Sequence, residues 1–220
     1  MCGRYVLDEV EQLADRFKVG ELPDNIPSNF NVSPSHVMPV IVEDDKGRHI
    51  EFMKWGIPKF VAKDTIKALI NTKAESAFKP TWNKHVLHQR CLVPAVGFYE
   101  WLTKKDEPKK PYFIHMKNED IFAFAGVWST WKDENQKEWK VYSIMTTEPN
   151  KEMSAIHNRA PIMLHQEDES SWLKPSSVTR DSIEPLLRPL EDNGLEMWEV
   201  SSDVGNPRNN YKELMLPVHA

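Results

Sequence analysis

The sequence lacks the features that mark several large classes of protein. Its 220 residues include only two cysteines, Cys2 and Cys91, whose wide spacing gives neither a disulfide framework nor a CxxC metal-binding motif. No stretch approaches the roughly 20 consecutive apolar residues of a membrane helix, and the charged start of the chain does not resemble a signal peptide. These absences favour a cytoplasmic protein in a reducing compartment, with no membrane as a partner.

The sequence also lacks an excess of positive charge. Its 33 aspartates and glutamates outnumber its 28 lysines and arginines, which gives a formal net charge of −5. Proteins that bind nucleic acid usually carry a basic domain, so the composition counts against that function. Net charge is only a sum, however, and a binding groove needs no more than a local excess of lysine and arginine. Nucleic-acid binding is therefore less expected, but it is not excluded.

The composition, with 40% hydrophobic and 10% aromatic residues, is that of a globular protein. Short strand-like runs occur at residues 3–7, 37–43, 48–55, 67–70, 90–93, 97–101, 112–116, 122–128 and 140–145. Helical patterns occur at residues 81–88, 150–156, 167–173 and 183–187. No internal repeat or linker divides the chain. We therefore expect one α+β domain over residues 1–220, built around a largely antiparallel, barrel-like sheet with flanking helices.

Local signals add detail to this expectation. Asp8, followed three residues later by Glu11, resembles a capping box and predicts that a helix follows the first strand. Asp181 is the expected N-cap of the helix at residues 183–187. The segment 22–39 is rich in proline and asparagine, and we expect it to run over the surface as an ordered loop. Cys91 lies in an apolar run and is expected in the core.

Cys2 is the most informative single residue. Methionine is normally removed when the second residue is small, so we expect the mature chain to begin at Cys2. An N-terminal cysteine carries a free α-amine, whose ordinary pKa is about 7.7–8.0, beside a thiol whose ordinary pKa is about 8.5. With an aldehyde, the amine forms a Schiff base and the thiol then closes a five-membered thiazolidine ring. Taken alone, however, a cysteine at this position is more often accidental.

A series of short motifs extends along nearly the whole chain. They are MCGRY (1–5), NVSPS (31–35), WGIP (55–58), NTKAES (71–76), RCLVPAVGFYEW (90–101), MTTEPN (145–150), IHNRAP (156–161) and GNPRNN (205–210). Their order and spacing resemble those of the SOS-response-associated peptidase (SRAP) family. The resemblance implies a mixed α/β fold whose curved sheet lines a DNA-binding cleft. It also implies that mature Cys2 crosslinks to the ring-opened aldehyde of abasic sites in single-stranded DNA and shields the lesion during the DNA damage response.

The resemblance assigns roles in the chemistry to three further residues. Asn71 is expected to hold the N-terminus or the sugar, although its local sequence equally fits a buried asparagine at a strand end. Glu100 is expected to shuttle protons around the Cys2 amine and the opening sugar. Its place between two aromatic residues on a strand fits a desolvated carboxyl and a solvated one equally well. His157 is expected to be the second acid or base; without its motif, a lone histidine is more often structural.

The resemblance also implies a DNA-binding surface. Arg4, Lys73 and Arg159 lie within the motifs and are expected to contact phosphates beside the lesion. Trp55 is expected either to stack on a base or to fill the core. The chain departs from the family at two of these places: relatives commonly have arginine at the position of Lys73, and several have paired tryptophans where this chain has Lys54 and Trp55. Lysine lacks the phosphate-binding fork of arginine, so these departures predict weaker DNA binding rather than altered chemistry.

Two other functions remain open. The chain could be an N-terminal-nucleophile thiol autopeptidase that acts on other proteins, with Glu100 and His157 as bases for removal of its own Met1. No serine-histidine-aspartate signature or HExxH zinc motif supports a general protease. It could instead be a non-catalytic binding module, in which replacing Cys2 changes nothing. We expect no metal, no cofactor and no obligate protein partner; abasic single-stranded DNA is the expected partner, and whether a lyase reaction accompanies the crosslink is open.

Overall fold

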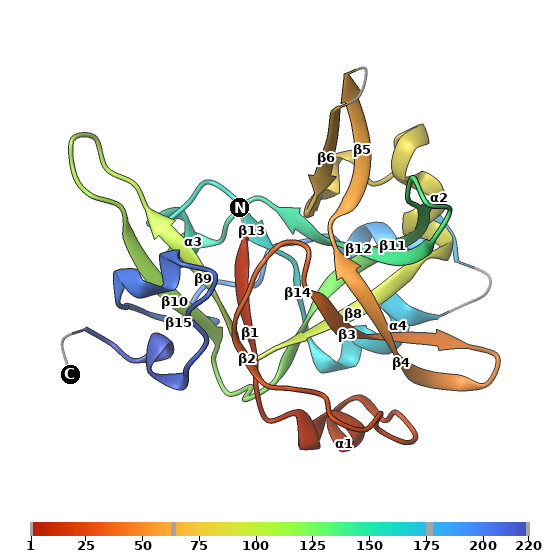
Figure 1. Cartoon of the computed structure of the whole chain (residues 1–220), viewed down its shortest axis with the longest axis horizontal. Coiled ribbons are helices and arrows are strands. Elements are labelled where there is room, and N and C mark those ends of the chain that lie inside the picture. The colour runs from red at the N-terminus through yellow and green to blue at the C-terminus, as the bar shows by residue number, and fades with distance from the viewer. Residues whose placement is uncertain (1, 63–64, 175–177, 219–220) are drawn as a thin grey trace.

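The computed structural model describes residues 2–62, 65–174 and 178–218 (Figure 1). Its strands are β1 (Arg4–Leu7), β2 (Asn29–Val32), β3 (Val37–Asp44), β4 (Gly47–Trp55), β5 (Ile57–Ala62), β6 (Thr65–Leu69), β7 (Asn71–Lys73), β8 (Arg90–Ala95), β9 (Gly97–Leu102), β10 (Lys110–Met116), β11 (Phe122–Lys132), β12 (Glu138–Thr147), β13 (Ala160–Pro161), β14 (Met163–Leu164) and β15 (Leu195–Glu199). Its α-helices are α1 (Leu13–Phe17), α2 (Pro80–His88), α3 (Lys151–Ser154), α4 (Gln166–Leu173) and α5 (Arg180–Ile183). Among the described residues, no helix combines the length and the apolar character needed to cross a bilayer.

Five of these strands close into a barrel. In the order β12–β4–β3–β8–β11 each strand pairs with the next, and β11 returns to pair with β12. Within the barrel, the β12–β4 pairing is parallel and the other four are antiparallel. Helix α4 packs against β8, where the Trp172 indole N–H donates to the Cys91 carbonyl at 3.0 Å. The expected α+β class and the largely antiparallel, barrel-like sheet are confirmed.

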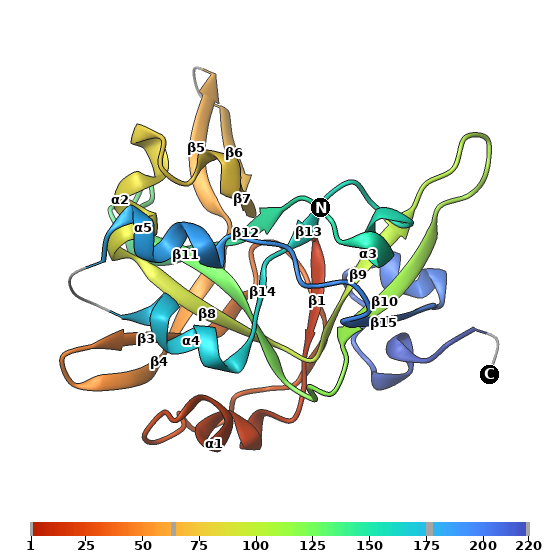
Figure 2. The same ribbon diagram turned by 180° about the vertical axis from the view of Figure 1, so that it is seen from behind.

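A second sheet lies beside the barrel, in the strand order β15–β10–β9–β1–β2. The chain passes from β8 of the barrel through Val96 into β9 of the second sheet, and the Val96 N–H donates to the Val6 carbonyl of β1 at 3.0 Å. The start of β1 lies between two projecting hairpins, β5–β6 and β9–β10, as both views show (Figures 1 and 2). The fold therefore places the beginning of the chain between two arms.

The β3–β4 hairpin forms where the sequence predicts it. Its register runs from Val37 opposite Lys54 to Asp44 opposite Gly47, which leaves a two-residue turn. Gly47 has a φ of +105°, a conformation that side chains disfavour. The Asp44 carboxylate accepts the Lys46 N–H at 2.8 Å inside this turn. The predicted helix at residues 81–88 is also confirmed as α2, and the helix at residues 167–173 as α4.

Two predictions near the N-terminus are wrong, because distant contacts outweigh the local signal. Residues 22–39 are not only a surface loop: they contain β2, which pairs with β1 and places Asn31 in the interior. The helix predicted after the first strand is present as α1, but Asp8 does not cap it, since Glu9 takes a left-handed φ of +54° and a 3-10 turn precedes α1. Asp8 instead lies 3.5 Å from the Lys212 ammonium.

The cap assigned to Asp181 is wrong as well. Helix α5 begins one residue earlier, and Asp181 lies inside its first turn. Thr179 is the N-cap, and Thr179 and Ser182 form a reciprocal capping box. The α-helix ends at Ile183 and continues as a 3-10 turn over Glu184–Leu186.

Candidate active site

Strand β7 holds the start of the chain. Asn71, its first residue, donates a hydrogen bond from Nδ2 to the Cys2 carbonyl oxygen at 2.8 Å. Asn71 lies beside Ile144 in a parallel register on β12, and the buried Thr72 and Ser143 hydroxyls, 2.9 Å apart, join the two strands. The side chain that fixes Cys2 is therefore anchored on the barrel.

The Cys2 side chain is fully buried, and its Sγ lies 3.8 Å from the Arg4 carbonyl oxygen. Burial raises the pKa of the Cys2 thiol far above its ordinary value, and the negative charge of Glu100 raises it further. At neutral pH the thiol is therefore protonated, so a reaction at sulfur needs a base that takes the proton. Cys91 is also fully buried, and its expected place in the core is confirmed.

Glu100 lies on β9, close to the start of the chain. The β1–β9 register pairs Arg4 with Tyr99, so the next step of the ladder brings Glu100 to the residue before Arg4. Only 6% of Glu100 is exposed, and its Oε1 accepts the Trp101 backbone N–H at 3.2 Å. Of the two environments that the sequence allowed, the structure shows the desolvated one. Because its charge acts on the Cys2 thiol, Glu100 is the candidate acceptor for the thiol proton.

His157 lies in the loop between α3 and β13. Its backbone N–H donates to the Met153 carbonyl at 2.8 Å, which continues the turn of α3. Its Nδ1 accepts the Arg159 backbone N–H at 3.0 Å. A ring nitrogen that accepts a hydrogen bond carries no proton, so this contact assigns the proton of the neutral ring to Nε2. His157 is thereby set to act as a donor through Nε2.

The end of β12 brings the motifs together. Thr146 pairs with Lys73 of β7 on one side and with Pro161 of β13 on the other. The segments that carry Asn71 and His157 therefore flank the same strand end. Both ribbon views show β13 beside the start of the chain (Figures 1 and 2).

Arg4, an expected phosphate contact, fastens the C-terminal segment to β1. Its Nη1 donates to Asn31 Oδ1 at 2.8 Å and to the Val204 carbonyl at 2.9 Å. The Asn31 amide in turn donates to the carbonyls of Val204, Asn206 and Asn209 at 3.2, 3.0 and 3.0 Å. The NVSPS and GNPRNN motifs are thus joined by hydrogen bonds, and much of the donor capacity of Arg4 is used within the chain.

The other three residues expected to bind DNA differ in their access to solvent. Lys73 is exposed. Arg159 is mostly buried, and both of its Nη atoms donate to the Glu75 carboxylate. Trp55 is fully buried, stacked on Tyr142 with ring centroids 6.3 Å apart. Of the two roles expected for Trp55, the structure shows the core one.

Sequence reasoning passed over two residues that the structure makes prominent. Glu75 binds Arg159 across the end of β12, and Asn31 connects β2 to the C-terminal segment. Glu75 lies in the NTKAES motif and Asn31 in the NVSPS motif, so membership of a motif was the available signal. No feature of their neighbouring residues distinguishes them from the other residues of these motifs. The buried hydroxyls of Tyr5 and Tyr142, 2.8 Å apart, likewise have no local signature.

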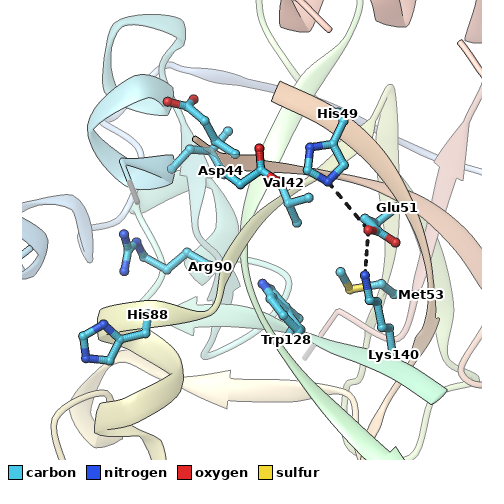
Figure 3. A pocket seen from close by; sticks show the side chains of 11 residues that line it. Val42, Asp44, His49, Glu51, Met53, His88, Arg90, Trp128 and Lys140 are labelled. Atoms are coloured by element: carbon cyan, nitrogen blue, oxygen red, sulfur yellow. Dashed lines mark hydrogen bonds and ion pairs between the residues drawn. The ribbon is translucent and has the colours of Figure 1, made fainter. Parts of the chain in front are cut away.

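A cavity of about 230 Å³ opens at one end of the barrel (Figure 3). All five barrel strands line it, and none of the expected site residues does; its lining is Val42, Glu43, Asp44, His49, Glu51, Met53, His88, Arg90, Trp128, Lys140 and Leu173. Glu51 contacts both the Lys140 ammonium at 2.6 Å and the His49 ring at 3.6 Å, so its charge is balanced locally. Among the described residues, no group of three or more histidine, cysteine, aspartate or glutamate side chains could hold a metal ion.

Comparisons with known proteins identify relatives along the whole chain. Residues 1–207 match the family of SOS response associated peptidases (SRAP). Abasic site processing protein YoqW of Bacillus subtilis is 34% identical over 221 residues, covering 98% of this chain and 99% of that protein. Abasic site processing protein YedK of Escherichia coli is 27% identical, covering 99% of this chain and 100% of that protein. A crystal structure of a protein from Bacteroides thetaiotaomicron shares the fold, with a TM-score of 0.84, 24% identity, and coverage of 98% of this chain and 99% of that chain.

Proposed function

Since the chain belongs to the SOS-response-associated peptidase (SRAP) family, we propose that it processes abasic sites in single-stranded DNA by bonding to them covalently through mature Cys2. The observation that carries the proposal is the assembly at the chain start, where Asn71 holds Cys2 and the charge of Glu100 acts on the Cys2 thiol. The names of the relatives YoqW and YedK, both abasic site processing proteins, support this substrate.

The proposed reaction condenses Cys2 with the aldehyde of the ring-opened sugar. The α-amine adds to the aldehyde carbon, and loss of water gives a Schiff base. The thiol sulfur then bonds to the same carbon while the C=N π electrons move to nitrogen, which takes up a proton, so that a thiazolidine and one water are the products. Glu100 takes the thiol proton and returns it to the nitrogen. The His157 Nε2–H donates to the sugar oxygen as the ring opens.

Removal of Met1 is part of this proposal. In the encoded chain the Cys2 nitrogen belongs to a peptide bond, so it cannot form a Schiff base until Met1 is removed. A peptidase activity confined to Met1 fits the family's name and the position of Glu100 beside the chain start. In this proposal, self-processing at Met1 is a maturation step of the same site, and cleavage of other proteins is not part of it.

The proposed DNA surface lies between the two projecting hairpins. Both arms carry exposed lysines, namely Lys59 and Lys67 on β5–β6 and Lys104, Lys105 and Lys109 on β9–β10. Asp106 and Glu107 offset part of the charge of the second arm, where Lys110 is already paired with Glu199. With the exposed Lys73, the lysines of the two arms supply a local excess of positive charge near Cys2, which the net charge of −5 hides. Because Arg4 is engaged within the chain, these lysines are the main sequence-independent phosphate contacts.

Two variants, each lacking one of the two cysteines, test the proposal. Wild-type protein, Cys2→Ala and Cys91→Ala are incubated with single-stranded DNA that contains an abasic site, and with undamaged DNA, then heated and analysed on denaturing gels and by intact mass. Wild type and Cys91→Ala should give an adduct that survives heating and lacks Met1. Cys2→Ala keeps an α-amine but has no thiol to close the ring, so it should give only a Schiff base that borohydride traps. A heat-stable adduct from Cys2→Ala would overturn the assignment.

A further inference from the structure

A fork-shaped ion pair joins the two motifs that flank the end of β12. Glu75 lies in a 3-10 turn directly after β7, and Arg159 directly precedes β13. The Arg159 Nη2 donates to Glu75 Oε2 at 2.9 Å, and its Nη1 donates to Glu75 Oε1. Nη2 also donates to the Thr146 carbonyl at 2.7 Å. The carboxylate therefore occupies both terminal nitrogens of the guanidinium.

With this geometry, the two terminal nitrogens of Arg159 cannot bind a phosphate in a bidentate manner while Glu75 is in place. A phosphate and a carboxylate both offer two oxygens to the same pair of guanidinium nitrogens. Within the described part of the chain, the remaining Nε is buried and has no hydrogen-bond partner, so it presents no alternative edge to solvent. A bidentate phosphate contact at the terminal nitrogens of Arg159 therefore requires that the Glu75 carboxylate leave.

The Arg159 side chain is more buried and more firmly held than the Glu75 side chain. The Arg159 side chain is only 14% exposed, whereas the Glu75 side chain is 60% exposed. Arg159 is also tied to Thr146, whereas the Glu75 carboxylate is held by Arg159 and by the Glu75 backbone N–H. The hydrogen bonds from Arg159 hold the pKa of Glu75 below its ordinary value, so the carboxylate is ionised at neutral pH. The mobile partner is thus the glutamate, and the fixed one is the arginine.

Resting on the proposed function, we propose that Glu75 is an exchangeable internal counter-ion, which occupies the phosphate-binding fork of Arg159 until a DNA phosphate displaces it. The exchange keeps the pair neutral in the free protein and opens the fork only for an anion of matching geometry. The Glu75 end of the pair lies largely in solvent, where water can hydrate the displaced carboxylate, and the phosphate replaces its charge on Arg159, so displacement is energetically accessible. Glu75 would then set how strongly, and for which anions, Arg159 contributes to binding.

A double-mutant cycle tests the exchange. Binding of fluorescent single-stranded DNA, undamaged so that no crosslink forms, is measured by anisotropy at one salt concentration for wild type, Glu75→Gln, Arg159→Gln and the double variant. Glu75→Gln keeps the side-chain shape and should tighten binding by about two- to fivefold, the range of an ion pair with one solvent-exposed partner. Arg159→Gln should weaken binding, and Glu75→Gln should have no effect in that background.

Glu148 provides the matched control. It is exposed and lines the same shallow hollow as Glu75, and no ion pair within the described residues joins it to Arg159. Glu148→Gln removes the same charge, and its effect should be smaller and equal in both backgrounds. If Glu75→Gln weakens DNA binding, Glu75 holds Arg159 in position and is not an exchangeable counter-ion. If Glu75→Gln tightens binding equally with and without Arg159, Glu75 only repels the DNA electrostatically. Either result overturns the exchange. If all four proteins fail to bind DNA, the proposed function fails and the exchange with it.

Discussion

Replacing Glu100 with glutamine separates the proton acceptor from the nucleophile. Glutamine has the same shape, and its side-chain oxygen can still accept the Trp101 N–H that now holds Oε1 at 3.2 Å. The β1–β9 pairing beside Cys2 should therefore persist. What the substitution removes is a buried carboxylate that can take up a proton.

The size of the effect follows from two opposing consequences. Loss of a positioned base slows proton transfer by about 10²–10⁴-fold. Loss of the negative charge lowers the raised pKa of the Cys2 thiol, because Glu100 is the second cause of that shift. Burial is the larger cause and remains, so the thiol stays protonated at neutral pH. Glu100→Gln should therefore crosslink about 10²-fold or more slowly at neutral pH, and the deficit should shrink at alkaline pH as hydroxide replaces the missing base.

The assay is a denaturing-gel time course on abasic single-stranded DNA, from neutral to alkaline pH. Glu100→Gln should reach the same end point as wild type, since both nucleophiles remain. Glu167→Gln is the control: Glu167 is an exposed residue of α4, outside both arms, and removing its charge should leave the crosslinking rate unchanged. If Glu100→Gln matches wild type in rate across the pH range, Glu100 takes no part in proton transfer and the reasoning from its burial is refuted.

A permanent N-terminal tag that retains Met1 should abolish the heat-stable adduct yet leave anisotropy-measured DNA binding intact; an adduct from the tagged protein would exclude the thiazolidine. Lys73→Arg should tighten DNA binding a few-fold, because arginine adds a bidentate fork at an exposed position, and an unchanged titration would remove Lys73 from the interface. Arg16→Met should lower the free energy of unfolding in urea by about 3–5 kcal/mol, since it leaves the buried Glu169 carboxylate without a partner 2.7 Å away. Burial raises the pKa of Glu169, so this loss should be largest above that pKa and fade as pH falls toward the carboxyl's unfolded value; Arg180→Met, which breaks an exposed pair, should change little.

The strands of the barrel are largely predictable from the sequence, because each combines apolar residues with a clear end. The β3–β4 hairpin carries Gly47 where its turn needs a positive φ, and β8, whose residues after Arg90 are apolar, is buried along its whole length. Closure of the barrel is not predictable in this way. It depends on a parallel pairing in which Val141 lies beside Lys54 and Tyr142 beside Trp55, and no local pattern encodes that long-range register.

The same limit applies to the site. The motifs located Cys2, Asn71 and Glu100, since each stands in a recognisable run of residues. They could not show that Arg159 is already paired with Glu75, 84 positions away in sequence. Nor could they show that Asn31, in a segment that reads as a loop, is buried because its amide meets three carbonyls near the C-terminus. Such residues become prominent only when the fold brings distant partners together.

In the encoded chain, the proposed nucleophile is inactive in two separate ways. Its nitrogen is acylated, and burial together with Glu100 raises the pKa of its thiol, so sulfur is present as a poorly reactive S–H. Under the proposed chemistry, removal of Met1 changes the first of these properties, because it frees the α-amine for Schiff-base formation. The pKa of the thiol stays raised, since burial is the larger cause, so closure of the ring still needs Glu100 as the acceptor of the thiol proton. Maturation therefore supplies the first nucleophile and Glu100 activates the second, so retention of Met1 and Glu100→Gln should block two different steps.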